Sequence, residues 1–383
     1  MDTSAPSLTK WAVSNGIKVN GIAAHKFPGR GLGIVAKRRL KAGEVILDIP
    51  MSVIRTGETV PPQILKAVQA CSVNGLLAAE LAMDTSELHA LWRTTLPSME
   101  ELNESMPLFW PPELQNLLPP PALALLRKQQ GKLSRDWSAV SAAFAQLSYD
   151  VYRYSWLLVS TRTFYYTPPD MAPEDTPEAD ECLAVVPFGD YFNHSDVATC
   201  KAAYSATGYE FKADRAVAKG EELYISYGTH SNDFLLVEYG FTLAKNKSDE
   251  VSLDTVILPL FSAKQKDMLK EADYLGNYAL EGPSMQDDEV ACYRTRIALR
   301  LLCMPLKKWN ECVKYGADDD DEYQSLVHEL LRQALKAYLE TVDNSLEQLA
   351  RLEVGLPSQR EVLRRRWEEI GMNLAIAIDR IEQ

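Results

Sequence analysis

The chain has 383 residues, of which 46% are hydrophobic, and its formal net charge is −13 at pH 7. It is too long for one compact core, so we expect two or three units, and no run approaches the roughly 20 apolar residues that a membrane span needs. The acidic balance argues against a nucleic-acid ligand, because phosphate binding needs clustered Lys and Arg, and it favours a basic protein surface as partner.

The amino terminus and the cysteines bear on the compartment. Residues 1–10 lack the charged start and apolar core of a signal peptide, so we expect a protein of the cytosol or the nucleus, away from membranes. The six cysteines are scattered, with no Cys-x-x-Cys pair. This spacing predicts reduced, mostly buried thiols, with no zinc or other metal and no disulfides.

The first expected elements in chain order are short strands. Residues 31–50 have the pattern of two strands around the turn Ala42-Gly43-Glu44. The same turn chemistry returns at 217–221, and a strand is expected directly after it, at 223–227. We interpret these stretches as distant parts of one β-domain.

The intervening stretch changes its hydrophobic period from that of a strand to that of a helix. Segments in which Leu, Ala, Trp and Tyr recur at helical spacing are 64–81, 87–96, 122–129 and 137–164. Prolines punctuate them, so the pattern indicates a helical insert made of several helices.

The last part of the chain is again helical, with apolar residues three and four apart over 326–352 and 360–381. The sequence therefore predicts an α+β protein whose β-core of short strands is followed by an all-α domain. The expected boundaries are 15–245 for the first domain, with its insert at about 57–180, and 250–383 for the second.

A glycine pair raises the question of a dinucleotide site. The segment that begins Gly31-Leu32-Gly33 fits the fingerprint G-x-G-x-x-A. Its context opposes that interpretation, because residues 23–28 make a poor strand, and a strand and a turn follow where the fingerprint needs a phosphate-capping helix. Glycines here still allow a backbone to come close to a ligand.

The densest group of polar and aromatic residues lies at 186–195 and is followed by 222–228 and 231–241. Together with Arg30-Gly31-Leu32-Gly33, this order resembles the SET-domain methyltransferases, in particular the branch typified by the plant Rubisco large-subunit lysine methyltransferase. The resemblance implies a SET core split by the helical insert, a helical substrate-binding domain at the carboxyl end, and S-adenosylmethionine as the cofactor.

The resemblance also implies a set of cofactor contacts. Gly31-Leu32-Gly33 would support the methionine end of S-adenosylmethionine, and Asn193 and His194 would hold its adenosine and methionine portions. Arg162 would pair with the cofactor carboxylate through charge-assisted hydrogen bonds. The alternatives are a plain loop at 193–194 and a surface arginine at 162. The family often has an acidic residue where Arg30 stands.

Four aromatic residues are expected at the reacting centre by the same resemblance. Tyr227 matches the catalytic tyrosine, which also contacts the cofactor, and Tyr239 and Tyr204 match two further pocket tyrosines. Phe164 would line the substrate channel, where relatives that methylate histidine tend to carry Asn. Core packing is the alternative for each of them, because tyrosines are common in strands.

The first hypothesis is an S-adenosylmethionine-dependent protein-lysine N-methyltransferase, and we expect its protein substrate not to be a histone. We expect a monomer that uses no metal. A second hypothesis is a SET-fold adaptor that has lost catalysis and docks a partner through its carboxyl-terminal helices. A third keeps the enzyme and changes the acceptor to histidine, which Phe164 disfavours.

Overall fold

The computed structural model describes residues 5–169, 171–172, 174, 176–281, 290–316 and 321–383. The chain forms two compact units, Met1–Asn103 with Arg127–Thr229 and Glu104–Leu126 with His230–Gln383. The division falls inside α5 (Met99–Ser105) and α7 (Pro120–Ala143), so residues 104–126 group with the carboxyl-terminal helices. The domain boundaries expected from the sequence stay a prediction.

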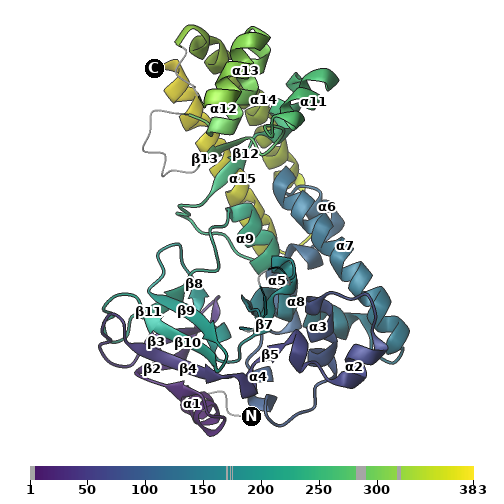
Figure 1. Cartoon of the computed structure of the whole chain (residues 1–383), viewed down its shortest axis with the longest axis vertical. Helices are drawn as coiled ribbons and strands as arrows, with labels where there is room; N and C mark the ends of the chain where they lie inside the picture. Colours follow the sequence, from purple (N-terminus) through teal and green to yellow (C-terminus); the bar gives the residue numbers. More distant parts are fainter. Residues whose placement is uncertain (1–4, 170, 173, 175, 282–289, 317–320) are drawn as a thin grey trace. The chain divides into compact units, whose positions relative to one another are not determined.

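The strands of the first unit form small sheets of short strands (Figure 1). One sheet has the order β1-β4-β10-β9, namely Lys18–Val19, Val45–Pro50, Gly208–Ala213 and Cys200–Ser205. Another has the order β2-β3-β11-β8, namely Ile22–Phe27, Gly31–Ala36, Glu222–Ile225 and Asn193–His194. A third has the order β5-β7-β6, namely Arg55–Thr56, Leu183–Val185 and Thr163–Tyr165.

The expected α+β architecture is confirmed, and with it the joining of distant segments into one β-domain. Strand β11 pairs antiparallel with β3 and parallel with β8, although about 190 residues separate β3 from β11. One expectation is wrong, because the poor strand predicted at 23–28 is a regular strand, β2, paired with β3 along its length. Its first three residues are buried, and the cross-strand hydrogen bonds of β3 compensate for its weak local preference.

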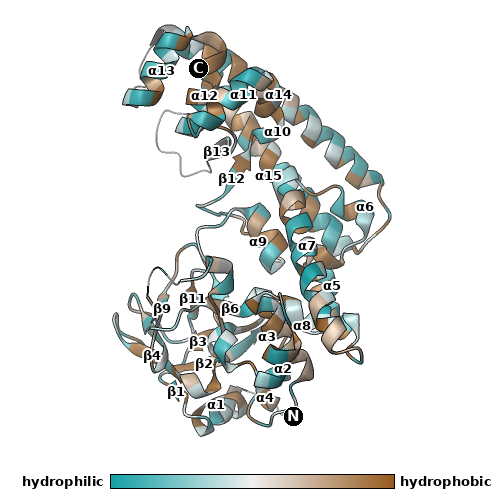
Figure 2. Cartoon of the chain, turned by 45° about the vertical axis from the view of Figure 1, so that its right-hand side comes forward, coloured by the Kyte–Doolittle hydropathy of each residue, from teal (hydrophilic) through white to brown (hydrophobic). Residues whose placement is uncertain are grey.

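Helices of the insert cover the first unit, as the change of period predicts. They include α2 (Pro62–Ala67), α3 (Val73–Met83), α4 (Ala90–Arg93), α8 (Tyr149–Arg162) and the later part of α7, and α1 (Ala5–Ser14) precedes the strands. Helix α3 packs against α8, and Figure 2 shows its apolar character. The side chain of Ser72 caps α3 by accepting a hydrogen bond from the Gly75 amide.

A buried cluster of charged groups ties strand β5 to the insert. Arg55 of β5 donates to Asp84 and contacts Glu80, and Arg93 donates to Asp84 at 2.5 Å. Arg55 also donates to Nδ1 of His89 at 2.7 Å, and Nε2 of His89 lies 3.1 Å from the Val53 carbonyl oxygen. Both ring nitrogens are satisfied when His89 is neutral, so the cluster favours the uncharged imidazole.

We expect this cluster to make stability depend on pH. Burial, helped by the charge of Arg55, lowers the pKa of His89 from 6.5 to about 4. The contribution of His89 is therefore complete above pH 6.5 and is lost as the pH falls toward 4, with about 2 kcal/mol lost by pH 5. Urea unfolding at about pH 7.5 and pH 5 checks this. The native chain should lose more stability between the two than His89→Gln, and equal losses would contradict the assignment.

The second unit is built on two long helices, α14 (Asp321–Arg351) and α15 (Pro357–Glu382), which pack against each other. The other elements are α6 (Pro112–Gln115), α9 (Asn232–Tyr239), α10 (Asp254–Ile257), α11 (Ala263–Glu271), α12 (Tyr293–Cys303), α13 (Leu306–Tyr315) and the antiparallel pair β12 (Glu250–Ser252) and β13 (Ala279–Glu281). The indole of Trp367 donates to the Leu117 carbonyl at 2.8 Å, which ties residues 104–126 to α15.

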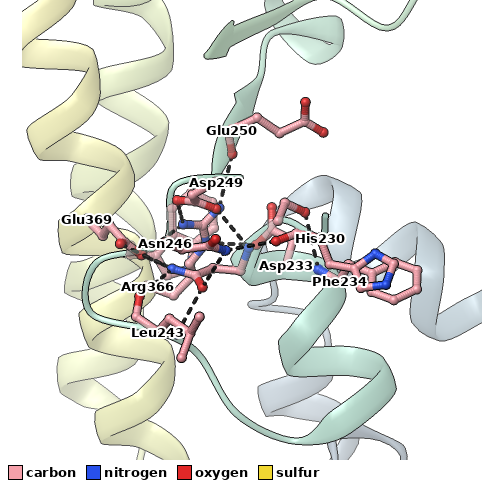
Figure 3. Close-up of polar contacts among 12 residues, drawn as sticks. His230, Asp233, Phe234, Leu243, Asn246, Asp249, Glu250, Arg366 and Glu369 are labelled. Atoms are coloured by element: carbon pink, nitrogen blue, oxygen red, sulfur yellow. Dashed lines mark hydrogen bonds and ion pairs between the residues drawn. The ribbon is translucent and has the colours of Figure 1, made fainter. Parts of the chain in front are cut away.

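A buried arginine organises the start of α9 within the second unit (Figure 3). The fully buried side chain of Arg366 donates to Asp233 at 2.9 Å, to Asp249 at 2.7 Å and to Glu369 at 2.9 Å. Asn232, also fully buried, donates its backbone amide to Asp249 at 2.8 Å. Helix α15 thereby holds both α9 and the loop that leads into β12.

Other expectations concern membranes, metals and thiols. Among the described residues, no helix is both long and apolar enough to cross a membrane. In that same part of the chain, His, Cys, Asp and Glu do not gather in groups of three that could hold a metal ion. The six cysteines are free thiols, and three of them are buried.

Candidate functional site

The sheet β2-β3-β11-β8 brings together segments from both ends of the first unit. Tyr224 of β11 lies opposite Asn193, and Ile225 lies opposite His194. Tyr227 follows two residues after β11 ends, so it emerges beside His194 and outside the strand that was expected to contain it. The parallel pairing of β11 with β8 is therefore the feature that joins the Asn-His pair to the predicted catalytic tyrosine.

Tyr227 is held at both ends by hydrogen bonds. Its backbone amide donates to Nδ1 of His194 at 3.0 Å, and its hydroxyl donates to the Phe192 carbonyl at 2.8 Å. The two rings lie 5.1 Å apart. Because Nδ1 accepts, the neutral His194 carries its proton on Nε2. The hydroxyl thus has a defined direction at a backbone carbonyl, which suits a group that orients a reactant.

Phe164 belongs to an aromatic cluster that reaches the same carbonyl-bearing residue. Its ring lies 5.8 Å from Phe211, which stacks on Phe192 at 5.0 Å, and 5.6 Å from Tyr209. Tyr204 lies 5.8 Å from Tyr209, its cross-strand neighbour. The cluster therefore connects Phe164 and Tyr204 with the backbone that receives the Tyr227 hydroxyl.

The Tyr204 hydroxyl has a partner in the strand connection. It lies 2.8 Å from the hydroxyl of Thr167, so one of the two donates to the other. Tyr204 thus combines aromatic packing with a satisfied polar end, as half-buried tyrosines do. Its expected role in the substrate pocket stays a prediction.

Arg162 ends α8 and forms an ion pair with an acid that the sequence analysis did not single out. Its guanidinium donates to the Asp190 carboxylate at 3.0 Å and to the Asp190 carbonyl at 3.1 Å. The Asp190 side chain is fully buried and also accepts from the indole of Trp92 at 3.1 Å. Burial raises the pKa of Asp190, and Arg162 opposes that shift. An acid inside the apolar run 185–192 was the available signal, because such a group needs a partner.

The turn that presents Asp190 is strained. Phe188 has a φ of 74° and is completely buried. A bulky side chain with positive φ is uncommon and persists only where surrounding packing holds it. The strain lies two residues before Asp190 and five before Asn193, so the chain uses packing energy to shape this loop.

Gly31 and Gly33 differ in what surrounds them. A Cβ atom on Gly31, whose φ is 72°, would meet no atom within 4 Å, whereas one on Gly33 would lie 2.7 Å from Nδ2 of Asn193. Gly33 is therefore needed for the close approach of β3 to Asn193, and Gly31 for its backbone conformation. Leu32, between them, is paired with Lys26 of β2.

Tyr239 is the last residue of α9 and belongs to the second unit. Its ring lies 6.3 Å from that of Phe241, and burial raises the pKa of Tyr239 to about 12. Its expected place in the substrate pocket stays a prediction. Ser231, from the same motif, is the N-cap of α9 and accepts from the Phe234 amide.

Two features of the first unit are compatible with binding of the expected cofactor. Nε of Arg162 is buried and has no hydrogen-bond partner among the described residues, so this guanidinium retains a donor for a ligand carboxylate. The bare backbone at Gly31 offers close approach at the other end of the motif. A cofactor with an amino-acid portion matches this donor set.

Comparisons with known proteins establish the family. The SET domain matches residues 31–228, slightly more than half of the chain, and the C-terminal domain of ribosomal lysine N-methyltransferase 2 matches residues 249–374. The chain belongs to the SET-domain family.

Individual relatives agree with this assignment. The SET domain-containing protein 4 of Homo sapiens is 30% identical over 79% of this chain and 73% of its own length. The ribosomal lysine N-methyltransferase set11 of Schizosaccharomyces pombe is 25% identical over 80% of this chain and 77% of its own length. The structure of Rubisco LSMT bound to AdoMet has the same fold, with a TM-score of 0.65 and 18% identity, covering 100% of this chain and 92% of that one.

Proposed function

We propose that the chain is an S-adenosylmethionine-dependent methyltransferase that transfers a methyl group to the side-chain amine of a lysine in a protein. The observation that carries the proposal is the hydroxyl of Tyr227, bonded to the Phe192 carbonyl beside His194, in a chain of the SET family. The similarity to a protein named ribosomal lysine N-methyltransferase supports the choice of acceptor.

S-adenosylmethionine, when bound, supplies an electrophilic methyl group on a sulfonium. Gly31-Leu32-Gly33, Asn193 and His194 would bind it, and Arg162 would hold its carboxylate. Methyl transfer to an amine is an in-line displacement that needs no covalent enzyme intermediate, so positioning by these side chains dominates the rate.

The acceptor lysine has to be neutral. Removing the proton from a group with a pKa of roughly 10.4 at pH 7 costs on the order of 4 to 5 kcal/mol. The aromatic cluster around Phe164 offers an apolar wall that disfavours the ammonium ion and lowers this cost. Tyr227 orients the amine through its hydroxyl and is not the general base, because the hydroxyl keeps its proton and donates it in a hydrogen bond to the Phe192 carbonyl.

The test is methyl incorporation from isotope-labelled S-adenosylmethionine into a soluble cell lysate, with the labelled residue located by mass spectrometry. We expect label on lysine only when the protein is added. Label on histidine would overturn the choice of acceptor and favour the third hypothesis. Absence of label despite measured cofactor binding would favour the adaptor.

The proposed function also concerns the partner protein and the cellular compartment. A protein surface rich in lysine suits a chain with net charge −13, since long-range attraction accelerates such encounters. We propose that the enzyme acts as a monomer in the cytoplasm or the nucleus. Sedimentation of the purified chain at several concentrations checks its oligomeric state, and fluorescent tagging in cells checks the compartment.

A further inference from the structure

The carboxylate of Glu222 accepts hydrogen bonds from several residues next to the expected cofactor contacts. Glu222 begins β11, and its side chain is 9% exposed. It accepts from Nδ2 of Asn193 at 2.8 Å and from the guanidinium of Arg30 at 2.9 Å. The hydroxyl of Tyr224 donates to it at 2.6 Å. Three donors from three segments thus converge on one nearly buried acid, which satisfies its charge.

The surroundings of Gly33 independently show that the hydrogen bond between Asn193 and Glu222 lies close to the backbone of β3. A Cβ atom at position 33 would lie 2.8 Å from Oε1 of Glu222 and 2.7 Å from Nδ2 of Asn193. Those are the two atoms that form the hydrogen bond between the acid and the amide. The glycine of β3 therefore leaves room for this bond, and any side chain there would push the two partners apart.

The bond decides how the Asn193 amide is turned. Its nitrogen end faces Glu222 and donates one of its two hydrogens to the carboxylate, which accepts and cannot donate. The other end of the amide, Oδ1, is an acceptor. Oδ1 of an Asn in this state accepts from a ligand donor such as an amino group, and this oxygen would repel a ligand acceptor.

Arg30 forms an ion pair at a position where the family often has an acidic residue. Its guanidinium bonds to Glu222 and lies 4.6 Å above the ring of Phe27, with half of the side chain exposed. The family often has an acid at this position, and here Arg30 balances an acid supplied by β11 instead. The pair leaves the segment with no net charge from these two groups.

We propose that Glu222 is a positioning residue of the cofactor site: it holds the Asn193 amide with its oxygen presented to an amino group of S-adenosylmethionine, and Arg30 balances its charge. This inference rests on the proposed function, because it takes Asn193 as a cofactor contact. Glu222 acts through Asn193 and does not touch the cofactor.

The experiment is a double-mutant cycle on cofactor binding. Calorimetry measures the Kd of S-adenosylmethionine and of its demethylated product for the native chain, Glu222→Met, Asn193→Ala and the double variant. Methionine keeps the length of the side chain and removes the acceptor. We expect Glu222→Met to weaken binding of both ligands by about tenfold, as for loss of a hydrogen bond to a charged group. The double variant should bind no more weakly than Asn193→Ala alone.

Conservative and matched variants sharpen the result. Glu222→Gln keeps an oxygen that accepts from Asn193, so it should restore most of the affinity lost in Glu222→Met and also serves if the Met variant does not fold. Glu221→Ala is the control, because that neighbouring acid also pairs with an arginine, Arg215, but at the surface. It should leave the Kd unchanged.

The outcomes distinguish the proposed function from the positioning role of Glu222. A native chain that binds neither ligand overturns the proposed function. A native chain that binds, with Glu222→Met unaffected or with additive losses in the double variant, overturns the positioning role alone. Equal losses in Glu222→Gln and Glu222→Met overturn it as well, because the negative charge and not the amide orientation would then matter.

Discussion

Replacement of Tyr227 by Phe should lower kcat for lysine methylation by about 10²-fold or more, the usual cost of removing one preorganised hydrogen-bonding group from a reacting centre. The variant loses only the hydroxyl that bonds to the Phe192 carbonyl. Its ring still packs beside His194, so the cofactor Kd should change little. Single-turnover methylation of the lysine substrate, with calorimetry of the cofactor in parallel, separates the two quantities.

The matched control is Tyr149→Phe, because Tyr149 is a partly exposed tyrosine of α8. Its variant should keep the native rate. A preserved rate in Tyr227→Phe would assign catalysis to another group. A loss confined to cofactor affinity would make Tyr227 a binding residue only.

Replacement of Arg366 by Ala should lower the free energy of unfolding by about 3 to 5 kcal/mol. Burial by itself lowers the pKa of Arg366, but Asp233 and Asp249 outweigh it and raise the pKa, so this side chain is always charged. Its removal leaves those two carboxylates buried without their counter-ion (Figure 3). Urea unfolding at neutral pH, followed by circular dichroism, gives the difference.

A neighbouring arginine provides the control for that measurement. Arg365 lies on the same helix and pairs with Glu361, but its side chain is 71% exposed. Exposed pairs contribute about 0 to 1 kcal/mol, so Arg365→Ala should be close to neutral. Similar losses in the two variants would mean that the helix itself, and not the buried network, is affected.

The sequence was most informative where a local pattern has one physical meaning. Helical periodicity predicted α3, α8, α14 and α15, because amphipathic spacing over many residues has few alternatives. The segment 23–28 shows the limit of this reasoning. Its local preference for a strand is weak, yet pairing with β3 makes it β2, since strand formation depends on cross-strand neighbours that lie elsewhere in the sequence.

The same limit applies to the site. The order of motifs was enough to connect Asn193, His194 and Tyr227 with a SET family, and the parallel pairing of β11 with β8 brings the three together. Asp190 and Glu222 lie within the segments 186–195 and 222–228, yet the sequence assigned them no role, because a single acid carries no motif of its own. Their importance comes from burial and from the donors that surround them.

The sequence by itself thus determined the class of fold, the family and the order of the candidate motifs, since hydrophobic period and motif order are local properties of the chain. Only the tertiary structure decided which polar groups share an environment: Arg162 with Asp190, Asn193 with Glu222, and Arg366 with its carboxylates. The reason is physical. The strength of a charge or a hydrogen bond depends on burial and geometry, and both arise from residues far apart in the sequence.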